Sequence, residues 1–304
     1  MEKSELPVGK LNKVAADFNG RMGFYIEDLN TGLIHQHNQK QRFPTASVCK
    51  ITVLIELFRQ VEEGQLSLDQ RHRLEGNVST HGSGTLSLMK DGPEMTLLDY
   101  SRMMIAVSDN IATDTLINIL GTDCINATLD KLGFPNTRTS VTIGRYHYRM
   151  AGLADDVPCS TENDALYKQA IDEAGGPDFS SLSYQDSLEN NVATPADMGA
   201  ILKQLHQGSI VTPAASAAMI ELLKTCQDRR MLAHPVARGI SIAHKSGSSG
   251  RIKGDVGIIF LPTGPLIVSA FALAADSDVN GGEAIAQISR LAVEACSPAS
   301  INAV

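Results

Sequence analysis

The chain has 304 residues, enough to bury a large core as one domain or as two closely packed lobes. Its formal net charge of -8 at pH 7 argues against a general binder of nucleic acid or of anionic membranes, because such binders carry a basic excess. Tryptophan is absent and aromatic residues make up only 5% of the chain, which disfavours sugar-stacking and single-strand-binding surfaces. A small molecule is therefore the expected partner.

The N-terminal residues show no basic segment followed by an apolar stretch, so no secretory signal is visible. No later apolar run is long enough to span a bilayer. The expectation is a cytoplasmic protein for the sequence as given, or a periplasmic or secreted one if a signal peptide was removed. The five cysteines are odd in number and widely scattered, which predicts reduced thiols without a disulfide framework or a metal site. No cofactor is expected.

The first elements are predicted to be a helix and a hairpin. Apolar residues at helical spacing predict a short helix over residues 11–18. Strands over residues 21–29 and 33–37 flank a turn rich in Asn and Gly. His35 and His37 share one strand face, as paired metal ligands can. Without a second His cluster or an acidic neighbour, a solvent-facing hairpin is favoured over a metal site.

The most distinctive stretch covers residues 43–62, where a proline precedes an apolar run dense enough to predict a buried helix. Ser47 and Lys50 interrupt the start of this run. Residues three apart lie on the same helix face, so the hydroxyl and the amine can point into one pocket. Burial shifts a lysine toward its neutral form, which can accept a proton from a nearby serine. The pair predicts a nucleophile with its base, although Ser-x-x-Lys also arises by chance about once in such a chain.

The middle of the chain is predicted to be helical. One helix opens with Thr96 as its cap and ends at Ser108-Asp109-Asn110, directly before a further apolar helix over residues 111–120. The triplet is either a set of capping residues or a polar junction that presents a hydroxyl and an amide to a cavity. Residues 82–84, Gly-Ser-Gly, lack the Gly-Lys-Ser/Thr sequence of a phosphate loop, so an ordinary loop is favoured.

The remaining helices fall in and after a long polar stretch. Residues 136–191 are irregular and acidic, and they predict a lid or pocket wall with one short helix over residues 163–174. Another helix restarts at residue 194 with a proline in its first turn, and a further one covers residues 213–226.

The last third of the chain returns to strands. A strand over residues 240–245 is expected to break at the Gly- and Ser-rich residues 246–250. Strands over residues 255–261 and 266–274 then form a second hairpin, and a helix over residues 282–296 closes the chain.

Strands at both ends with helices between them predict an α+β fold. One antiparallel sheet is built from the two chain ends and flanked by helices, and the middle of the chain forms an all-helical lobe. The expected organisation is a single catalytic unit over residues 1–304. Within it, residues 1–46 and 240–304 form the α/β lobe and residues 47–239 form the helical lobe.

Three motifs occur in order along the chain: Ser47-Val48-Cys49-Lys50, Ser108-Asp109-Asn110 and Lys245-Ser246-Gly247. Together they resemble the signature elements of class A β-lactamases and penicillin-binding proteins. Residues 91–120 and 191–205 also look like segments of this family, so the resemblance covers nearly the whole chain except the polar stretch before Asn191. It implies a β-lactamase/transpeptidase-like fold and a serine hydrolase that opens a β-lactam or related amide through an acyl-serine intermediate.

The resemblance also implies roles for individual residues. Ser47 attacks a carbonyl, and Lys50 is the candidate base. Ser108, held beside Lys245, relays a proton to the leaving nitrogen. Asn110 hydrogen-bonds a substrate amide.

The third motif is implied to bind the substrate. The backbone N–H groups of Ser47 and Ser248 form an oxyanion hole. The turn of Lys245 receives a substrate carboxylate. Arg251 or Lys253 assists there, or else the two lie on a solvated strand edge. The implied binding residues are Asn110, Ser246, Gly247 and Ser248.

One family motif is missing. Class A β-lactamases carry Glu-x-x-Leu-Asn on the loop after the second motif, and its glutamate activates the water that releases the acyl group. This chain contains no Glu-x-x-Leu-Asn, and residues 136–144 include no acid. Acids of the enlarged loop either replace the glutamate or are merely solvated: Asp155, Asp156, Glu162 and Glu189. Without such a base an acyl-enzyme would persist, so the natural substrate is left open.

Three alternatives follow. A cytoplasmic amidase or esterase with a non-β-lactam substrate would use the same acyl-serine. A penicillin-binding-protein-like peptidase would need export and a membrane anchor, and neither is visible in the sequence. A catalytically silent binder has no need of Ser47, Lys50, Ser108 and Lys245 together.

Overall fold

The computed structural model describes residues 6–75, 78–79, 81–89, 92–277 and 280–302. The chain divides into two compact units by its internal packing. One unit is Met1–Val48 with Ala193–Val304, and the other is Cys49–Val192. The expectation of a single catalytic unit over the whole chain stays a prediction.

The first unit contains a five-stranded antiparallel sheet in the order β2-β1-β9-β8-β7. Its strands are β1 (Gly20–Asp28), β2 (Ile34–His37), β7 (Ile242–Ser249), β8 (Ile252–Leu261) and β9 (Gly264–Ala274). Its helices are α1 (Val8–Asp17), α8 (Pro195–His206), α9 (Pro213–Leu223) and α10 (Gly281–Cys296). Short strands β3 (Phe43–Pro44) and β6 (Val192–Ala193) also occur along the chain. The prediction of one antiparallel sheet built from the two chain ends is confirmed.

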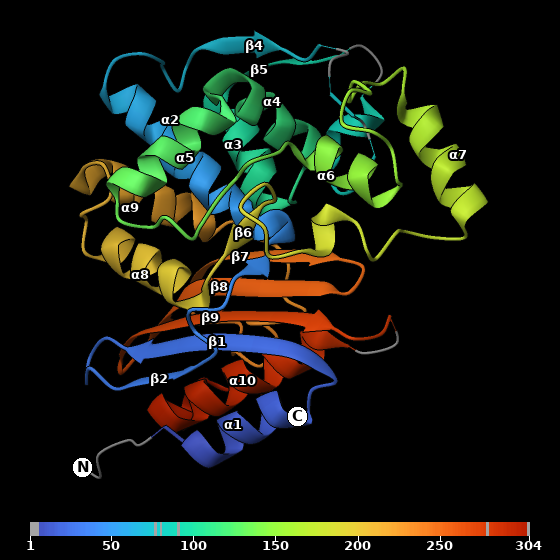
Figure 1. Ribbon diagram of the computed structural model, residues 1–304. Coiled ribbons are helices and arrows are strands. Elements are labelled where there is room, and N and C mark those ends of the chain that lie inside the picture. The colour runs from blue at the N-terminus through green and yellow to red at the C-terminus, as the bar shows by residue number, and fades with distance from the viewer. Residues whose placement is uncertain (1–5, 76–77, 80, 90–91, 278–279, 303–304) are drawn as a thin grey trace. The chain divides into compact units, whose positions relative to one another are not determined.

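Alternation along β1 separates the two faces of this sheet. Met22, Phe24 and Ile26 belong to the core that α1 and α10 share with the strands. Tyr25 points the opposite way, since a Cβ atom on Gly199 of α8 would lie only 2.4 Å from its ring. Figure 1 shows α1 and α10 side by side on one face of the sheet and α8 on the other.

Helices α8 and α9 therefore pack on the sheet, although the sequence placed residues 193–239 in the helical lobe. Contacts of α8 with β1 and β9, and of α9 with β7, account for the difference. Their apolar positions predict helices well but do not reveal which partner they cover.

The second unit contains a short ribbon and six helices among the residues described. The ribbon pairs β4 (Arg71–Arg73) with β5 (Glu94–Thr96). The helices are α2 (Lys50–Glu62), α3 (Leu97–Ala106), α4 (Asn110–Leu120), α5 (Thr122–Lys131), α6 (Ile143–Met150) and α7 (Asp164–Ala174). Helix α2 contacts α3, α4 and α5 and is buried on almost every side, as its dense apolar run predicts.

Two local predictions were wrong. Strand β7 does not break at residue 246 but continues to Ser249, which pairs with Ile252 of β8. Position 247, inside the strand, requires glycine, because a Cβ atom there would stand 2.4 Å from the carbonyl oxygen of Thr45. Helix α6 was not expected at all, yet Thr142 caps it by accepting a hydrogen bond from the N–H of Arg145.

The structure also shows the surroundings of the two hairpin histidines and of the cysteines. The rings of His35 and His37 lie against Phe24, with centroids 5.5 and 5.7 Å away. No group of three His, Cys, Asp or Glu residues in the described part of the chain is arranged to hold a metal ion. No disulfide joins the cysteines in the described ranges, and Cys49 is buried while Cys124 is exposed. No helix of the described ranges is both long enough and apolar enough to cross a membrane.

A buried carboxylate anchors α2 to α5. Glu56 accepts hydrogen bonds from Arg59 Nε at 2.8 Å and Nη2 at 2.7 Å, from Gln60 Nε2 at 2.7 Å, and from Thr128 Oγ1 of α5 at 2.7 Å. Burial raises the pKa of Glu56, but the bonds from Arg59, Gln60 and Thr128 outweigh it and hold the pKa below its usual range.

We expect Glu56→Gln to lower the free energy of unfolding by about 1.5–3 kcal/mol, because the amide nitrogen would face donors that now meet an ionised oxygen. Chemical denaturation measures the difference. Glu63→Gln is the matched control, since Glu63 is half-exposed and pairs with the same Arg59. Equal losses in both variants would contradict this account of Glu56.

Candidate active site

Three predicted site residues meet in the second unit. Lys50 is fully buried, and its Nζ atom donates to the carbonyl oxygen of Ser108 at 2.8 Å and to Ser108 Oγ at 3.0 Å. It also donates to Asn110 Oδ1 at 3.0 Å. Removing an ammonium from water is costly unless its donors are satisfied, so this junction of α3 and α4 stabilises the buried charge.

The loop of residues 82–84 supports the same junction, which the sequence did not reveal. Ser83 Oγ donates to the carbonyl oxygen of Ser108 at 2.7 Å and to Asn110 Oδ1 at 3.2 Å. The N–H of Asn110 donates back to the carbonyl oxygen of Ser83 at 2.9 Å. The only hint in the sequence was the Gly-Ser-Gly pattern, which was interpreted as an ordinary loop.

Ser108-Asp109-Asn110 is both a cap and a polar junction. Asp109 Oδ1 accepts from the N–H of Ala112, which is the capping role. Its Oδ2 atom accepts from the N–H groups of Thr85 and Leu86 at 2.6 and 2.8 Å. Ser108 is held at φ = 55°, a left-handed conformation that is unusual for a residue other than glycine. The two readings of the triplet are therefore compatible.

The other predicted residues lie in the first unit. Ser47 belongs to a 3-10 turn, Ala46–Cys49, that leads directly into α2. Ala46, directly before the proposed nucleophile, is held at φ = 44°. Its backbone is therefore in the same strained left-handed region as that of Ser108. A Cβ atom on Gly247 would lie 2.9 Å from the Ser47 nitrogen, so β7 passes directly beside this turn. Only glycine allows that approach.

Strand β7 carries the third motif on a buried edge. Lys245 is fully buried, and its Nζ atom donates to the carbonyl oxygen of Ser246 at 2.8 Å. Ser246 Oγ donates to Asp228 Oδ2 at 2.8 Å. Arg230 pairs with Asp228 through Nε and Nη2, both at 2.9 Å. Burial raises the pKa of Asp228, but the bonds from Arg230 and Ser246 outweigh it, so the carboxyl stays ionised.

A small basic pocket lies at the end of this motif. It has a volume of about 240 Å³ and is lined by residues that include Arg230, Ser248, Lys253 and Glu283. Lys253 Nζ donates to Ser248 Oγ at 2.6 Å. Burial and the neighbouring charge of Arg230 lower the pKa of Lys253. Two nearby cations disfavour each other's charge, and an anion bound between them would relieve that repulsion. Arg251 does not line this pocket.

A buried ion pair links β7 to the neighbouring strand β8. His244 Nδ1 lies 2.9 Å from Asp255 Oδ1, and Asp255 Oδ2 accepts from the N–H of Leu232 at 3.0 Å. Burial lowers the pKa of His244, but the charge of Asp255 outweighs it and raises the pKa to about 10. The imidazolium is therefore a fixed support next to Lys245.

The four loop acids are poorly placed to replace the missing glutamate. Asp155, Asp156, Glu162 and Glu189 are all exposed. Arg149 binds Asp155 through Nε at 2.8 Å and Nη2 at 2.7 Å, which lowers the pKa of that carboxyl. None of the four is held near Lys50 by any contact in the described part of the chain.

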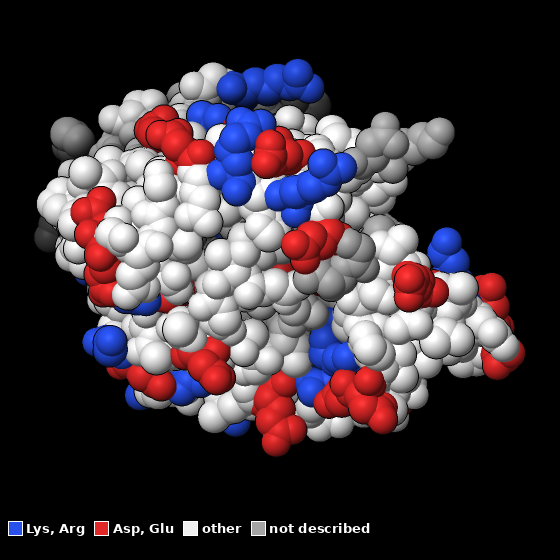
Figure 2. Space-filling model, turned by 90° about the horizontal axis from the view of Figure 1, so that it is seen from above, with Lys and Arg blue, Asp and Glu red and all other residues white. Residues whose placement is uncertain are grey.

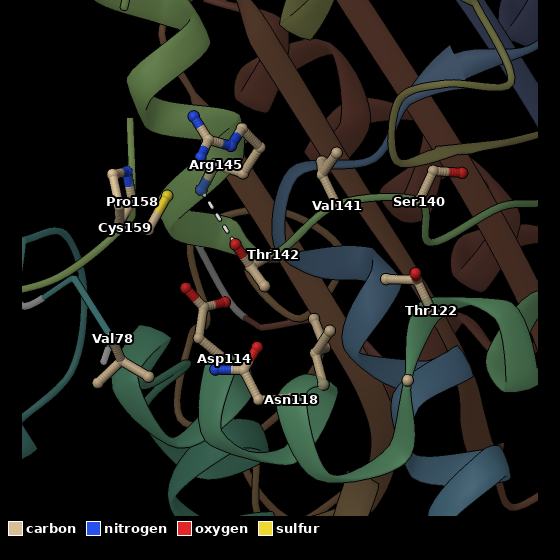
Figure 3. A pocket seen from close by; sticks show the side chains of 12 residues that line it. Val78, Asp114, Asn118, Thr122, Ser140, Val141, Thr142, Arg145, Pro158 and Cys159 are labelled. Carbon is tan, nitrogen blue, oxygen red and sulfur yellow. Dashed lines mark hydrogen bonds between the residues drawn. The ribbon is translucent and has the colours of Figure 1, made fainter. Parts of the chain in front are cut away.

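A larger pocket of about 550 Å³ lies within the second unit (Figure 3). Asp114 and Asn118 of α4 face Thr142 and Arg145 of α6 across it, with Cys159 nearby. Asp114 accepts from the N–H of Ile143 at 2.6 Å and from that of Gly144 at 2.7 Å, so it fixes the start of α6. None of the predicted site residues lines this pocket.

These features define a class of protein. An antiparallel sheet made from both chain ends, a helical unit and a Ser-x-x-Lys turn that opens a buried helix are those of a β-lactamase/transpeptidase-type α+β protein. Comparison with known proteins agrees. The family model described as "Beta-lactamase enzyme family" matches residues 7–296.

Curated and solved relatives are similar along most of their length. Beta-lactamase SME-1 of Serratia marcescens is 23% identical over 301 residues, covering 96% of this chain and 90% of the relative. A β-lactamase of known structure from Sphaerobacter thermophilus is 28% identical with a TM-score of 0.75, covering 96% of this chain and 97% of the other. The structure of PBP-A is 22% identical with a TM-score of 0.75, covering 94% of each chain, which shows the shared fold.

The chain therefore belongs to the beta-lactamase enzyme family. It is a serine hydrolase of the class A β-lactamase type.

We expect the stability of wild type relative to Asp114→Asn to fall as pH rises from about 4 to about 7. Burial raises the pKa of Asp114 to about 7, against the N–H groups of Gly144 and Ile143, which lower it. The folded state then holds a proton that the unfolded chain loses near pH 4, so raising the pH through this window destabilises the folded state. The slope is at most about 1.4 kcal/mol per pH unit for one proton.

Denaturant unfolding at several pH values measures this difference. Asp123→Asn is the control, because it removes one exposed acid from the neighbouring helix α5. A stability of wild type relative to Asp114→Asn that rises with pH, or that stays constant, would contradict the assignment.

Proposed function

We propose that this protein opens a β-lactam ring or a related amide through an acyl intermediate on Ser47. The observation that carries the proposal is the buried ammonium of Lys50, the first residue of the helix that follows the Ser47 turn. This ammonium is hydrogen-bonded to Ser108 Oγ and Asn110 Oδ1. A buried amine next to a hydroxyl is suited to move protons between groups. The printed names of the curated relatives, which are β-lactamases, support this substrate class.

In the proposed acylation step, each proton that moves has a named donor and acceptor. Lys50 acts as the base after its resting ammonium has released one proton, and Ser47 Oγ attacks the carbonyl carbon of the substrate while its own proton passes to the neutral amine. The N–H groups of Ser47 and Ser248 stabilise the oxyanion that develops. As the carbon–nitrogen bond breaks, Ser108 donates a proton to the leaving nitrogen and regains one from Lys50. The role that the family resemblance implies for Lys245 beside Ser108 stays a prediction.

Substrate binding uses the motif on β7 and the amide of Asn110. Gly247 brings the strand against the Ser47 turn, and Ser246 is oriented by Asp228. The pocket of Arg230 and Lys253 is suited to a substrate carboxylate. Between the two readings of Lys253, its placement in this pocket favours a binding role over a solvated edge.

Small molecules are the proposed partners. Figure 2 shows several Lys and Arg side chains next to one another near its top edge, with Asp and Glu side chains beside them and over the rest of that face. A non-β-lactam amide or ester would use the same groups, and comparing substrate classes in the assays below distinguishes these cases.

We expect Ser47→Ala to lower turnover of a chromogenic cephalosporin at least about 1000-fold, because no other group takes over a missing nucleophile. Intact-mass spectrometry should show the mass of one opened β-lactam added to wild type and none added to the variant. Ser67→Ala, at an exposed loop serine, is the control and should behave as wild type. Turnover by Ser47→Ala at the wild-type rate would refute the proposal.

We expect Lys253→Met to lower kcat/KM roughly 10-fold for a penicillin, since one charge-assisted hydrogen bond to the carboxylate is lost. The methyl ester of the same penicillin should lose far less. Arg251→Met serves as the matched control, because Arg251 lies two residues away but outside the pocket. An equal loss for acid and ester would count against a carboxylate site at Lys253.

A further inference from the structure

A thiol, an imidazole and a carboxylate meet within the first unit, and the proposed acyl transfer uses none of them. His244 Nδ1 lies 2.9 Å from Asp255 Oδ1, and the thiol of Cys226 is hydrogen-bonded to the same imidazole. All three residues belong to the unit that contains the five-stranded sheet. A cysteine next to an imidazole that a third group orients is the arrangement that activates a thiol as a nucleophile.

The sheet fixes the orientation of the imidazole. His244 on β7 is paired with Gly257 on β8, where a Cβ atom would lie 2.4 Å from the Cβ atom of His244. The missing side chain at Gly257 therefore lets the histidine lie close over β8. Asp255 is two residues away on that strand and so shares its face. Its Oδ2 atom accepts from the N–H of Leu232 at 3.0 Å, so both carboxylate oxygens are engaged.

The segment after α9 places the cysteine against this pair. Helix α9 contacts β7, and Cys226 follows three residues after the end of the helix. Two residues later, Asp228 accepts from Ser246 Oγ of β7, on the same strand face as His244. Cys226 is partly exposed, whereas His244 and Asp255 are buried. Of the three residues, only Cys226 is therefore open to a small reagent.

The imidazolium favours the ionised form of this thiol. Burial raises the pKa of Cys226. The hydrogen bond and charge of His244, together with the charge of Lys245, outweigh both burial and the charge of Asp255 and hold that pKa below its usual range. Burial instead raises the pKa of Cys296 to about 12. Because the thiolate is the reactive form of cysteine, these two thiols are expected to differ in reactivity.

We propose that Cys226, His244 and Asp255 form a modification site at which a hydroperoxide oxidises the cysteine to a sulfenic acid. Cys226 is the reacting residue, and the other two are positioning residues. A hydroperoxide suits the site because it is small enough to reach a partly exposed sulfur and reacts with thiolates. The inference is independent of the acyl intermediate proposed on Ser47.

The oxidation balances with hydrogen peroxide as the oxidant. The sulfur of Cys226 bonds to one peroxide oxygen as the oxygen–oxygen bond breaks, so the sulfur loses two electrons and the peroxide gains them. The second oxygen leaves as hydroxide, takes a proton from the His244 imidazolium and departs as water. The imidazole then regains a proton from solvent. The products are one sulfenic acid and one water.

We expect wild type treated with hydrogen peroxide and dimedone, which captures sulfenic acids, to be labelled on Cys226 at least about 10-fold faster than on Cys124. The neighbouring imidazolium is the reason, because it stabilises the reacting thiolate. Peptide mass spectrometry measures each rate. Cys124 on α5 is the internal control, since it is the more exposed of the two cysteines. Labelling of Cys226 that is no faster than that of Cys124 would overturn the proposal.

His244→Gln should slow the labelling of Cys226 at least about 10-fold and leave that of Cys124 unchanged, because a neutral amide stabilises a thiolate less than an imidazolium does. His234→Gln is the matched control, since it removes an exposed imidazole from the same unit. It should be labelled as wild type is. An unchanged rate at Cys226 in His244→Gln would refute the proposed site.

A measurement on wild type alone applies if His244→Gln does not fold. Iodoacetamide reacts with thiolates, so its rate with Cys226 should reach half of its limiting value below about pH 8.5, the usual pKa of a thiol. The charged groups that set this midpoint are His244, Lys245 and Asp255. A midpoint at or above that pH would contradict a stabilised thiolate at Cys226.

Discussion

One buried ammonium determines how the helical unit is built. Lys50 is removed from water at the first residue of α2, which costs several kcal/mol unless its donors are satisfied. Two oxygens of Ser108 and one of Asn110 satisfy them. These acceptors converge only because the junction of α3 and α4 adopts a left-handed turn at Ser108. The surrounding contacts from Ser83 and Asp109 make that turn stable.

The same constraint explains why stability and chemistry involve the same residues. The left-handed conformations fall at Ala46, directly before the proposed nucleophile Ser47, and at Ser108, which has a proposed proton-transfer role itself. Gly247 packs closely against the Ser47 turn, and Gly82 packs closely against the side chain of Asn110, because neither has a Cβ atom. Packing against glycine thus brings backbone groups and short polar side chains to where the reaction needs them, and the surrounding core maintains the strain.

The sequence predicted the features whose determinants are local. The spacing of Ser47 and Lys50, the apolar run behind them and the alternation in the terminal strands each depend on near neighbours along the chain. The continuation of β7 through Gly247 depends instead on Thr45, which lies far away in sequence. Helix α6 was hidden because its buried face uses Tyr146 and Tyr148 within a polar stretch, although a cap at Thr142 preceded it. The contact of His81 with His147 has no local signature at all.

Burial changes which titratable groups of the helical unit can act as bases. Burial favours the neutral form of every titratable group, so it raises the pKa of a carboxyl and lowers that of an imidazole. Asp114 and His147 show both directions within one unit, at about 7 and about 3. Asp114 is therefore partly protonated near neutral pH, whereas the imidazole of His147 keeps its lone pair. Glu56 and His244 shift the opposite way, because their hydrogen-bonded partners outweigh burial. The partners of a buried group, and not its depth alone, therefore decide whether that group can act as a base, and a sequence motif does not show those partners.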